Sequence, residues 1–159
     1  MKIERQKLQI YPVGRSEYEE VMGLVWKTFL RFEAEDYSRE GVQSFQDFIT
    51  DPVLYKMFKM GYYQIFGAFY GHKLVGMISL RDRTHISLLF VDERYHYQGI
   101  GRALMDYLKN YLVTELGEYK VTVNASPYGT GFYHRLGFHD TDVELVKEGI
   151  RYTPMILFL

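Results

Sequence analysis

The sequence predicts a single domain of the mixed α/β (α+β) class, with one mostly antiparallel, seven-stranded sheet and about four helices. Short apolar stretches alternate with longer ones in which apolar residues recur every three or four positions, in the order β-α-α-β-β-β-α-β-α-β-β. No linker, repeat or low-complexity tract interrupts residues 1–159, so we expect one domain. One helix joins two strands that must run parallel, which makes the sheet mixed.

The composition excludes several classes of protein. Apolar residues make up 47% and charged residues 25%, an ordinary globular balance. The net charge is −1 and no Lys/Arg cluster is present, so neither nucleic acid nor an anionic membrane is an expected partner. The chain has no cysteine, which excludes disulfides, thiolate zinc sites and a cysteine acyl-enzyme.

Two further expectations concern metal and location. No pair of histidines has the spacing of metal ligands, so we predict no metal site. No apolar run reaches the ~18 residues of a membrane-spanning helix. The N-terminal ten residues are too polar for a signal peptide. We therefore expect a cytoplasmic protein.

The first part of the chain is predicted to hold one strand and two helices. The strand covers 7–13, and Ser16 with Glu19 forms a capping box for the helix that follows. A second helix covers about 39–50 and stops before a proline. Residues 53–60 are expected to add one or two helical turns.

Three strands are predicted next. Residues 63–70 and 73–81 form a hairpin across the turn Gly71-His72. Residues 84–91 are almost continuously apolar, which is typical of a strand in the centre of a sheet.

The last part of the chain is predicted to alternate helices and strands. A helix starts at Ile100, a strand covers 119–125, and a short helix covers 129–137. Residues 138–145 and 150–159 form a closing antiparallel pair. The last strand could also pair with a second copy of the chain, so a homodimer and burial within one chain both remain open.

Two glycines stand where the helix at residue 100 begins. A glycine costs about 1 kcal/mol relative to alanine inside a helix, so Gly99 and Gly101 need a reason. The first N–H groups of a helix have no intrahelical partner and carry the positive end of its dipole, and glycines let a phosphate approach them. The spacing fits neither GxxxxGK[ST] nor GxGxxG. The alternative is that both glycines only relieve crowding between strand and helix.

The residues around these glycines resemble a known family. Residues 96–101, HYQGIG, are similar to the signature [RQ]-x-x-G-x-[GA] of the GNAT superfamily of acyl-CoA-dependent N-acetyltransferases. His96 departs from the Arg or Gln of the first position, and we assign its side chain no role. Residues 132–138, FYHRLGF, resemble the family's FYxxxGF block. The order of elements also matches the GNAT fold along nearly the whole chain.

The resemblance implies a GNAT-type acyl-CoA N-acyltransferase. Acetyl-CoA would be its cosubstrate and would lie where strands 84–91 and 119–125 separate, with the pantetheine arm pairing like an extra strand. The residues implied to bind it are Phe90, Val91, Tyr97, Gln98, Gly99, Ile100, Gly101, Arg102, Asn124 and Tyr133. The acetyl group would pass directly to a primary amine in a ternary complex, and backbone N–H groups near 89–91 would bind the thioester oxygen.

Two side chains are candidates for acid–base catalysis. The resemblance implies that Tyr133 donates a proton to the departing sulfur; the alternative is that it packs against pantetheine. His85 falls where histone-acetylating relatives carry a base glutamate, and a histidine with its ordinary pKa of about 6.5 suits that task. The alternatives are that His85 only caps or packs, and that a water chain replaces a dedicated base.

The acceptor amine is not identified by the sequence. Glu33, Glu35 and Asp36 lie between the first two helices, where the family places the acceptor, and could attract an amine. The alternative is a solvated acidic loop. A different class of function also remains, a non-catalytic acyl-CoA-binding regulatory module, although Tyr133 favours the enzyme.

Overall fold

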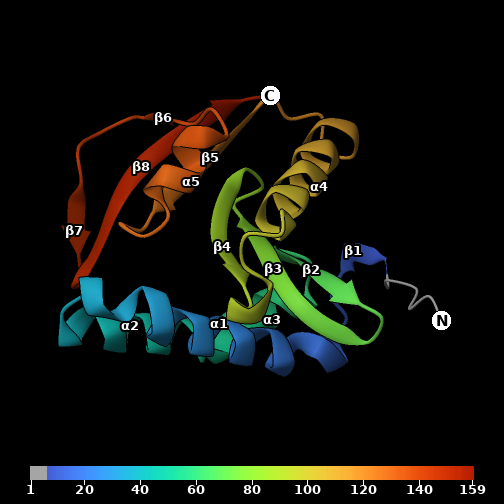
Figure 1. Ribbon diagram of the computed structural model, residues 1–159, viewed down its shortest axis with the longest axis horizontal. Coiled ribbons are helices and arrows are strands. Elements are labelled where there is room, and N and C mark those ends of the chain that lie inside the picture. The colour runs from blue at the N-terminus through green and yellow to red at the C-terminus, as the bar shows by residue number, and fades with distance from the viewer. Residues whose placement is uncertain (1–6) are drawn as a thin grey trace.

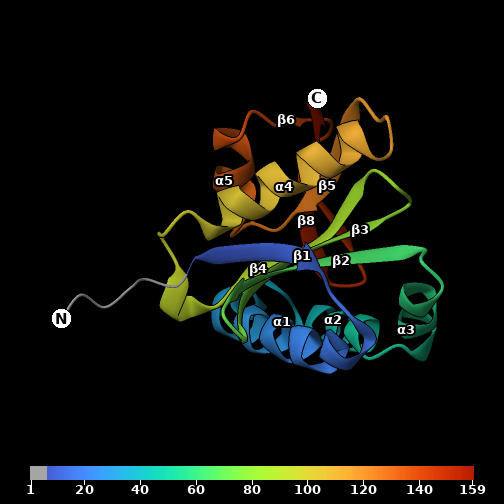
Figure 2. The ribbon, with the colours of Figure 1, turned by 90° about the vertical axis from the view of Figure 1, so that its right-hand side faces the viewer.

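A computed structural model describes residues 7–159, and one sheet separates two layers of helices within it (Figures 1 and 2). The strands are β1 (Leu8–Pro12), β2 (Tyr63–Tyr70), β3 (Lys73–Arg81), β4 (His85–Val91), β5 (Lys120–Ala125), β6 (His139–Asp140), β7 (Leu145–Lys147) and β8 (Ile150–Phe158). The helices are α1 (Tyr18–Phe32), α2 (Arg39–Ile49), α3 (Pro52–Lys59), α4 (Ile100–Thr114) and α5 (Thr130–Arg135), with short 3₁₀ turns η1 (Arg15–Glu17), η2 (Ala34–Asp36) and η3 (Glu93–Tyr95).

The sheet confirms the predicted fold class. Its strand order is β1-β2-β3-β4-β5-β8-β6, with β7 also paired to β8. All pairs are antiparallel except β4 with β5. Figure 2 shows α1, α2 and α3 on one face of the sheet and α4 and α5 on the other. As predicted, β4 lies in the centre of the sheet.

The helical turns expected at 53–60 are confirmed as α3. This helix is separate from α2 because the Asp51 carboxylate accepts from the Val53 N–H at 2.9 Å and Pro52 suits the first helical position. Two details differ from the prediction. The predicted strand 138–145 is divided into β6 and β7, so the described sheet has eight strands.

The second difference is at the start of α1. The 3₁₀ turn η1 precedes the helix, and Glu17 rather than Glu19 reaches back, accepting from the Gly14 N–H at 2.9 Å. The Ser16–Glu19 capping box is therefore wrong by two residues, because the tight turn takes up the first capping interactions.

Each face of the sheet has its own apolar core. Leu88 and Phe90 of β4 pack into the core beneath α1, α2 and α3. Ile86 packs into the opposite core, beneath α4 and α5. A helix layer covers each face, so β4 is apolar on both sides, which is why its sequence lacks a clean alternation.

The feature that positions the site is a gap between β4 and β5. These strands pair only at His85–Thr122 and Ile86–Val123 and then separate. On the other side of β4, Val91 faces Gly76, and the next N–H, of Asp92, donates to the Val75 carbonyl at 2.8 Å. Antiparallel pairing alternates, so the main-chain groups of Val91, and of Leu89 two residues before it, face the gap.

Candidate active site

A cleft of about 970 Å³ follows this gap. Its walls come from α1, α2, β4, the glycine loop before α4, β5, α5 and the β7–β8 hairpin. The predicted site residues that line it are Glu33, His85, Phe90, Val91, Tyr97, Gly99, Ile100, Gly101, Arg102, Asn124 and Tyr133. The structure thus brings most of the predicted residues to one place.

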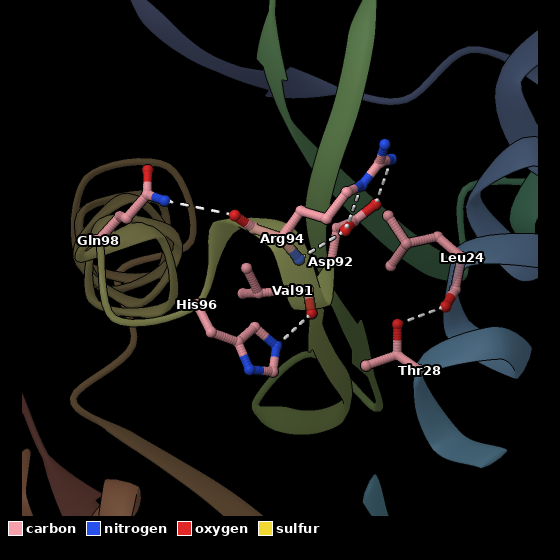
Figure 3. Close-up of polar contacts among 7 residues, drawn as sticks. All are labelled: Leu24, Thr28, Val91, Asp92, Arg94, His96 and Gln98. Carbon is pink, nitrogen blue, oxygen red and sulfur yellow. Dashed lines mark hydrogen bonds and ion pairs between the residues drawn. The ribbon is translucent and has the colours of Figure 1, made fainter. Parts of the chain in front are cut away.

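Gln98 does not line the cleft. Its side chain is exposed and donates to the Arg94 carbonyl at 3.4 Å, as Figure 3 shows. The preceding residue, Tyr97, has a left-handed backbone with φ of 61°. This local turn carries the Gln98 side chain away from the cleft, and the assignment of Gln98 to coenzyme binding stays a prediction.

Glu35 and Asp36 also stay outside the cleft, unlike Glu33. Glu35 is exposed on η2, and the Asp36 carbonyl accepts from the Arg151 guanidinium at 3.3 Å. The 3₁₀ turn after α1 reverses the chain within three residues, so the neighbours of Glu33 point in other directions. For Glu35 and Asp36 the structure therefore favours the alternative, a solvated acidic loop.

The two glycines have different local reasons. Gly99 caps the N-terminus of α4 with φ of 81°, a left-handed conformation that other residues adopt at a cost. A Cβ on Gly101 would lie 3.3 Å from the ring of Phe132 in α5, which is a tight contact. Gly101 is therefore crowded by helix α5 rather than by the strand before it, and the phosphate explanation for the loop stays a prediction.

The N-terminus of α4 keeps free donors beside the cleft. The Ala103 N–H is the first to bond back, to the Gly99 carbonyl at 2.9 Å. The N–H groups just before it, on Ile100, Gly101 and Arg102, have no carbonyl within the helix to bond to, and all three residues line the cleft. With the Arg102 side chain, this end of the cleft suits an anion.

The loop that carries these donors is held in place by Asp92. Its carboxylate accepts from the Arg94 N–H at 2.9 Å and from the Arg94 guanidinium at 3.1 Å (Figure 3). These bonds outweigh partial burial and lower the pKa of Asp92. The turn leading to the glycines is therefore fixed by a charged pair from its own residues.

Tyr133 of α5 lies in the wall of the cleft. Its side chain is buried, with edge-on contacts to Phe132 and Phe138 at 5.3 and 5.2 Å between ring centroids. Burial raises the pKa of the phenol well above its usual range, and the Glu33 carboxylate adds to the rise. Tyr133 therefore keeps its proton at neutral pH, as a proton donor must.

Glu33 follows the last residue of α1 and reaches the same part of the cleft. Burial raises its pKa to about 7, helped by Asp36 and opposed by hydrogen bonding from the hydroxyls of Ser126 and Tyr37. A carboxylate with a pKa near neutrality is about half ionised at neutral pH. Such a group can take and release a proton, which a normal surface glutamate does poorly.

His85 lies at the closed end of the gap. Its Nδ1 is 2.8 Å from the Thr122 hydroxyl, the neighbour with which it pairs across the two strands. Burial, assisted by the positive charge of Arg81, lowers its pKa to about 4. The ring is neutral at pH 7 but weakly basic, which favours the interpretation of His85 as a packing residue.

Two residues around Glu33 were not assigned a site role by the sequence. Ser126 comes directly after β5, and its hydroxyl approaches Glu33 closely enough to lower the pKa of that carboxyl. The hydroxyl of Tyr37, in the loop before α2, has the same effect. The only available signal for Ser126 was its position at the end of a strand beside the gap, where site residues commonly gather.

Residues 7–159 show neither a metal cluster nor a membrane span. No three His, Asp or Glu side chains of this range come together as metal ligands. None of its helices is both long and apolar enough to cross a membrane. The polar N-terminus, on which the signal-peptide expectation rests, lies partly outside the described range.

Comparison with known proteins identifies the family. Residues 33–159 match the acetyltransferase (GNAT) domain, and the chain belongs to this family. No curated protein sequence matches it significantly.

Solved structures share the fold at low sequence identity. A GCN5-related N-acetyltransferase from Rhodopseudomonas palustris has a TM-score of 0.82 at 20% identity, with all of both chains covered. The PaiA N-acetyltransferase from Thermoplasma acidophilum, solved with coenzyme A, has a TM-score of 0.79 at 16% identity, covering 96% of this chain and 99% of that one. A spermidine N-acetyltransferase, SpeG from Vibrio cholerae, has a TM-score of 0.67 at 16% identity, covering 95% and 93%.

Proposed function

We propose that this protein is an N-acetyltransferase that moves an acetyl group from acetyl-CoA to a primary amine by direct transfer in a ternary complex. The observation that carries the proposal is that Tyr133 and Glu33 meet in one cleft from opposite sides of the gap between β4 and β5. One is a buried proton donor and the other a carboxylate with a pKa of about 7. Family membership supports the acyltransferase class.

The coenzyme is proposed to bind mainly through main-chain groups. The pyrophosphate would accept from the N–H groups at Ile100–Arg102, and the pantetheine arm would pair with the free edge of β4 at Leu89 and Val91. Asn124 lines the cleft from β5 and would face the arm. The structural neighbour solved with coenzyme A supports an acyl-CoA cosubstrate.

The proposed reaction transfers two protons. An alkyl ammonium has a pKa of about 10.4, so Glu33 must take one proton before the nitrogen can attack the thioester carbon. The carbon–sulfur bond breaks, and Tyr133 donates its phenolic proton to the leaving thiolate. The second proton lost by the nitrogen restores the Tyr133 phenol. The products are the N-acetylated amine and coenzyme A, and Glu33 returns its proton to water.

The main chain contributes the remaining stabilisation. The tetrahedral intermediate carries an oxyanion, and the N–H groups of Leu89 and Val91 face the gap where it forms. Holding the thioester and the amine side by side supplies a further part of the rate. A role of His85 as the base stays a prediction. Its pKa of about 4 and its position beside Thr122 favour a packing role instead.

The test is release of free thiol from acetyl-CoA with a panel of amines. Polyamines come first, because several structural neighbours are described as spermidine N-acetyltransferases. Amino acids, aminoglycosides and peptide N-termini complete the panel. We expect turnover with at least one class. Coenzyme A binding by calorimetry without turnover in any class would instead support the non-catalytic acyl-CoA-binding module, and no binding would contradict both functions.

A further inference from the structure

His96 is the residue that departs from the family signature, and the structure gives it two contacts. It stands between the end of β4 and the glycine loop and lines the cleft. Its Nε2 lies 2.6 Å from the Val91 carbonyl oxygen, as Figure 3 shows. A carbonyl oxygen can only accept, so Nε2 carries the hydrogen of this bond.

The acceptor of this bond belongs to the free edge of β4. The main-chain groups of Val91 face the gap because the next residue, Asp92, pairs with β3. The Val91 carbonyl is therefore the last acceptor along the edge with which the pantetheine arm is proposed to pair. By bonding to it, His96 fixes the direction of the strand end and occupies one of the lone pairs of its carbonyl.

The second contact of His96 is to the helix end that carries Glu33. The His96 ring lies 4.8 Å from the ring of Phe32, measured between centroids. Phe32 is the last residue of α1 and directly precedes Glu33. The Phe32 ring also lies 5.2 Å from the ring of Tyr128, in the loop after β5. The end of α1 thus contacts the loops that follow both strands of the gap, with His96 as its contact in the loop after β4.

We propose that His96 is a positioning residue that sets the free edge of β4 through its N–H and the end of α1 through its ring. The proposal rests on the proposed function, because it requires coenzyme A to bind along this edge and Glu33 to act in the cleft. The two contacts use different parts of one side chain. Their effects are therefore separable by substitution.

The experiment compares two variants that each keep one contact. His96→Phe keeps a ring against Phe32 but loses the donor to Val91. His96→Gln keeps an N–H donor but loses the ring. The control is His72→Phe, the same change at an exposed turn residue that does not line the cleft. The measurements are the Kd of coenzyme A by calorimetry, kcat, KM for acetyl-CoA, and the pH dependence of kcat.

We expect the two variants to fail in different ways. Loss of one hydrogen bond, worth about 1 kcal/mol, should raise the Kd of coenzyme A about fivefold to tenfold in His96→Phe and leave kcat within about twofold. In His96→Gln the Kd should stay within about twofold of wild type. Its kcat should fall about fivefold, and the acidic limb of its pH profile should move, because Glu33 is no longer held in place.

Several results would overturn the proposal. One is an unchanged Kd in His96→Phe, and another is an equal loss of affinity in both variants. A third is an unshifted pH profile in His96→Gln. If neither variant folds, the ¹⁵N shifts of the wild-type imidazole decide, since a hydrogen on Nδ1 alone excludes the bond to Val91. Failure of wild-type protein to bind coenzyme A would contradict the proposed function itself.

Discussion

The two sides of the cleft are built in different ways. The proposed coenzyme side is made mainly of β4, the loop after it and the start of α4, which form one continuous stretch, 85–102. The proposed acceptor side brings Glu33 and Tyr37 together with Ser126 and Tyr133, which lie far along the chain. The first side offers mainly backbone groups, and the second offers side chains. A site made of backbone from one segment leaves a local pattern in the sequence, whereas a site made of distant side chains does not.

The largest effect is expected on the acceptor side, at Tyr133. In Tyr133→Phe the ring still fills the wall, but the proton for the leaving thiolate is lost. General-acid catalysis typically contributes at least about 100-fold, so kcat should fall by about that factor. The Kd of coenzyme A should stay within about twofold. A loss of coenzyme A affinity with an unchanged kcat would place Tyr133 on the coenzyme side. That result would contradict the division of the cleft into a coenzyme side and an acceptor side.

Glu33→Gln should have the next largest effect. It removes the group proposed to deprotonate the amine while keeping nearly the same shape. We expect kcat at pH 7 to fall about tenfold to a hundredfold, and the acidic limb with an apparent pKa of about 7 to disappear from the pH–rate profile. Glu35→Gln, a change outside the cleft, is the matched control. A profile that retains this limb in Glu33→Gln would assign the base to another group.

The coenzyme side can be tested at its two glycines. Gly101→Val places a branched side chain against Phe132 and beside the free N–H groups, so the Kd of coenzyme A should rise about tenfold or more. Gly99→Ala meets no atom within 4 Å but requires a left-handed backbone, which costs roughly 1 kcal/mol. It should therefore lower Tm and change the Kd less. An unchanged Kd in Gly101→Val would contradict the phosphate site.

Glu33 should also make stability depend on pH. Its folded pKa of about 7 exceeds the ordinary 4.5, so between these values the native state binds more protons than the unfolded chain. Stability from this group is therefore lost as pH rises through that window. Because Glu33 is partly exposed, we expect Glu33→Gln to be only about 1 kcal/mol more stable than wild type at pH 8. Urea unfolding at pH 4 and 8 measures this, and equal stabilities at pH 8 would contradict the raised pKa.

The smallest effect is expected at His85. The ring is neutral at pH 7 and lies at the closed end of the gap beside Thr122. His85→Asn should lower kcat by less than about threefold, with no change in the shape of the pH–rate profile. A larger loss that high pH restores would show that His85 acts as the base and would move this task from Glu33.

The sequence predicted the coenzyme side better than the acceptor side, for a physical reason. Strand 84–91, the loop and the apolar stripe of α4 are local patterns, and they appear in the structure within a residue or two. No local pattern of this kind distinguishes Glu33, which lines the cleft, from Glu35 and Asp36, which do not. A single 3₁₀ turn directs Glu33 into the cleft and the other two away from it.

The sequence by itself determined the order of the elements, the central position of β4 and the glycine loop at the start of α4. These depend on spacing and on backbone conformation, which neighbouring residues fix. Only the tertiary structure decided where β4 and β5 separate, that Glu33 and not Glu35 or Asp36 lines the cleft, and that the pKa of Glu33 is about 7. Burial and the approach of Ser126 set that pKa, and both arise only when distant segments pack together.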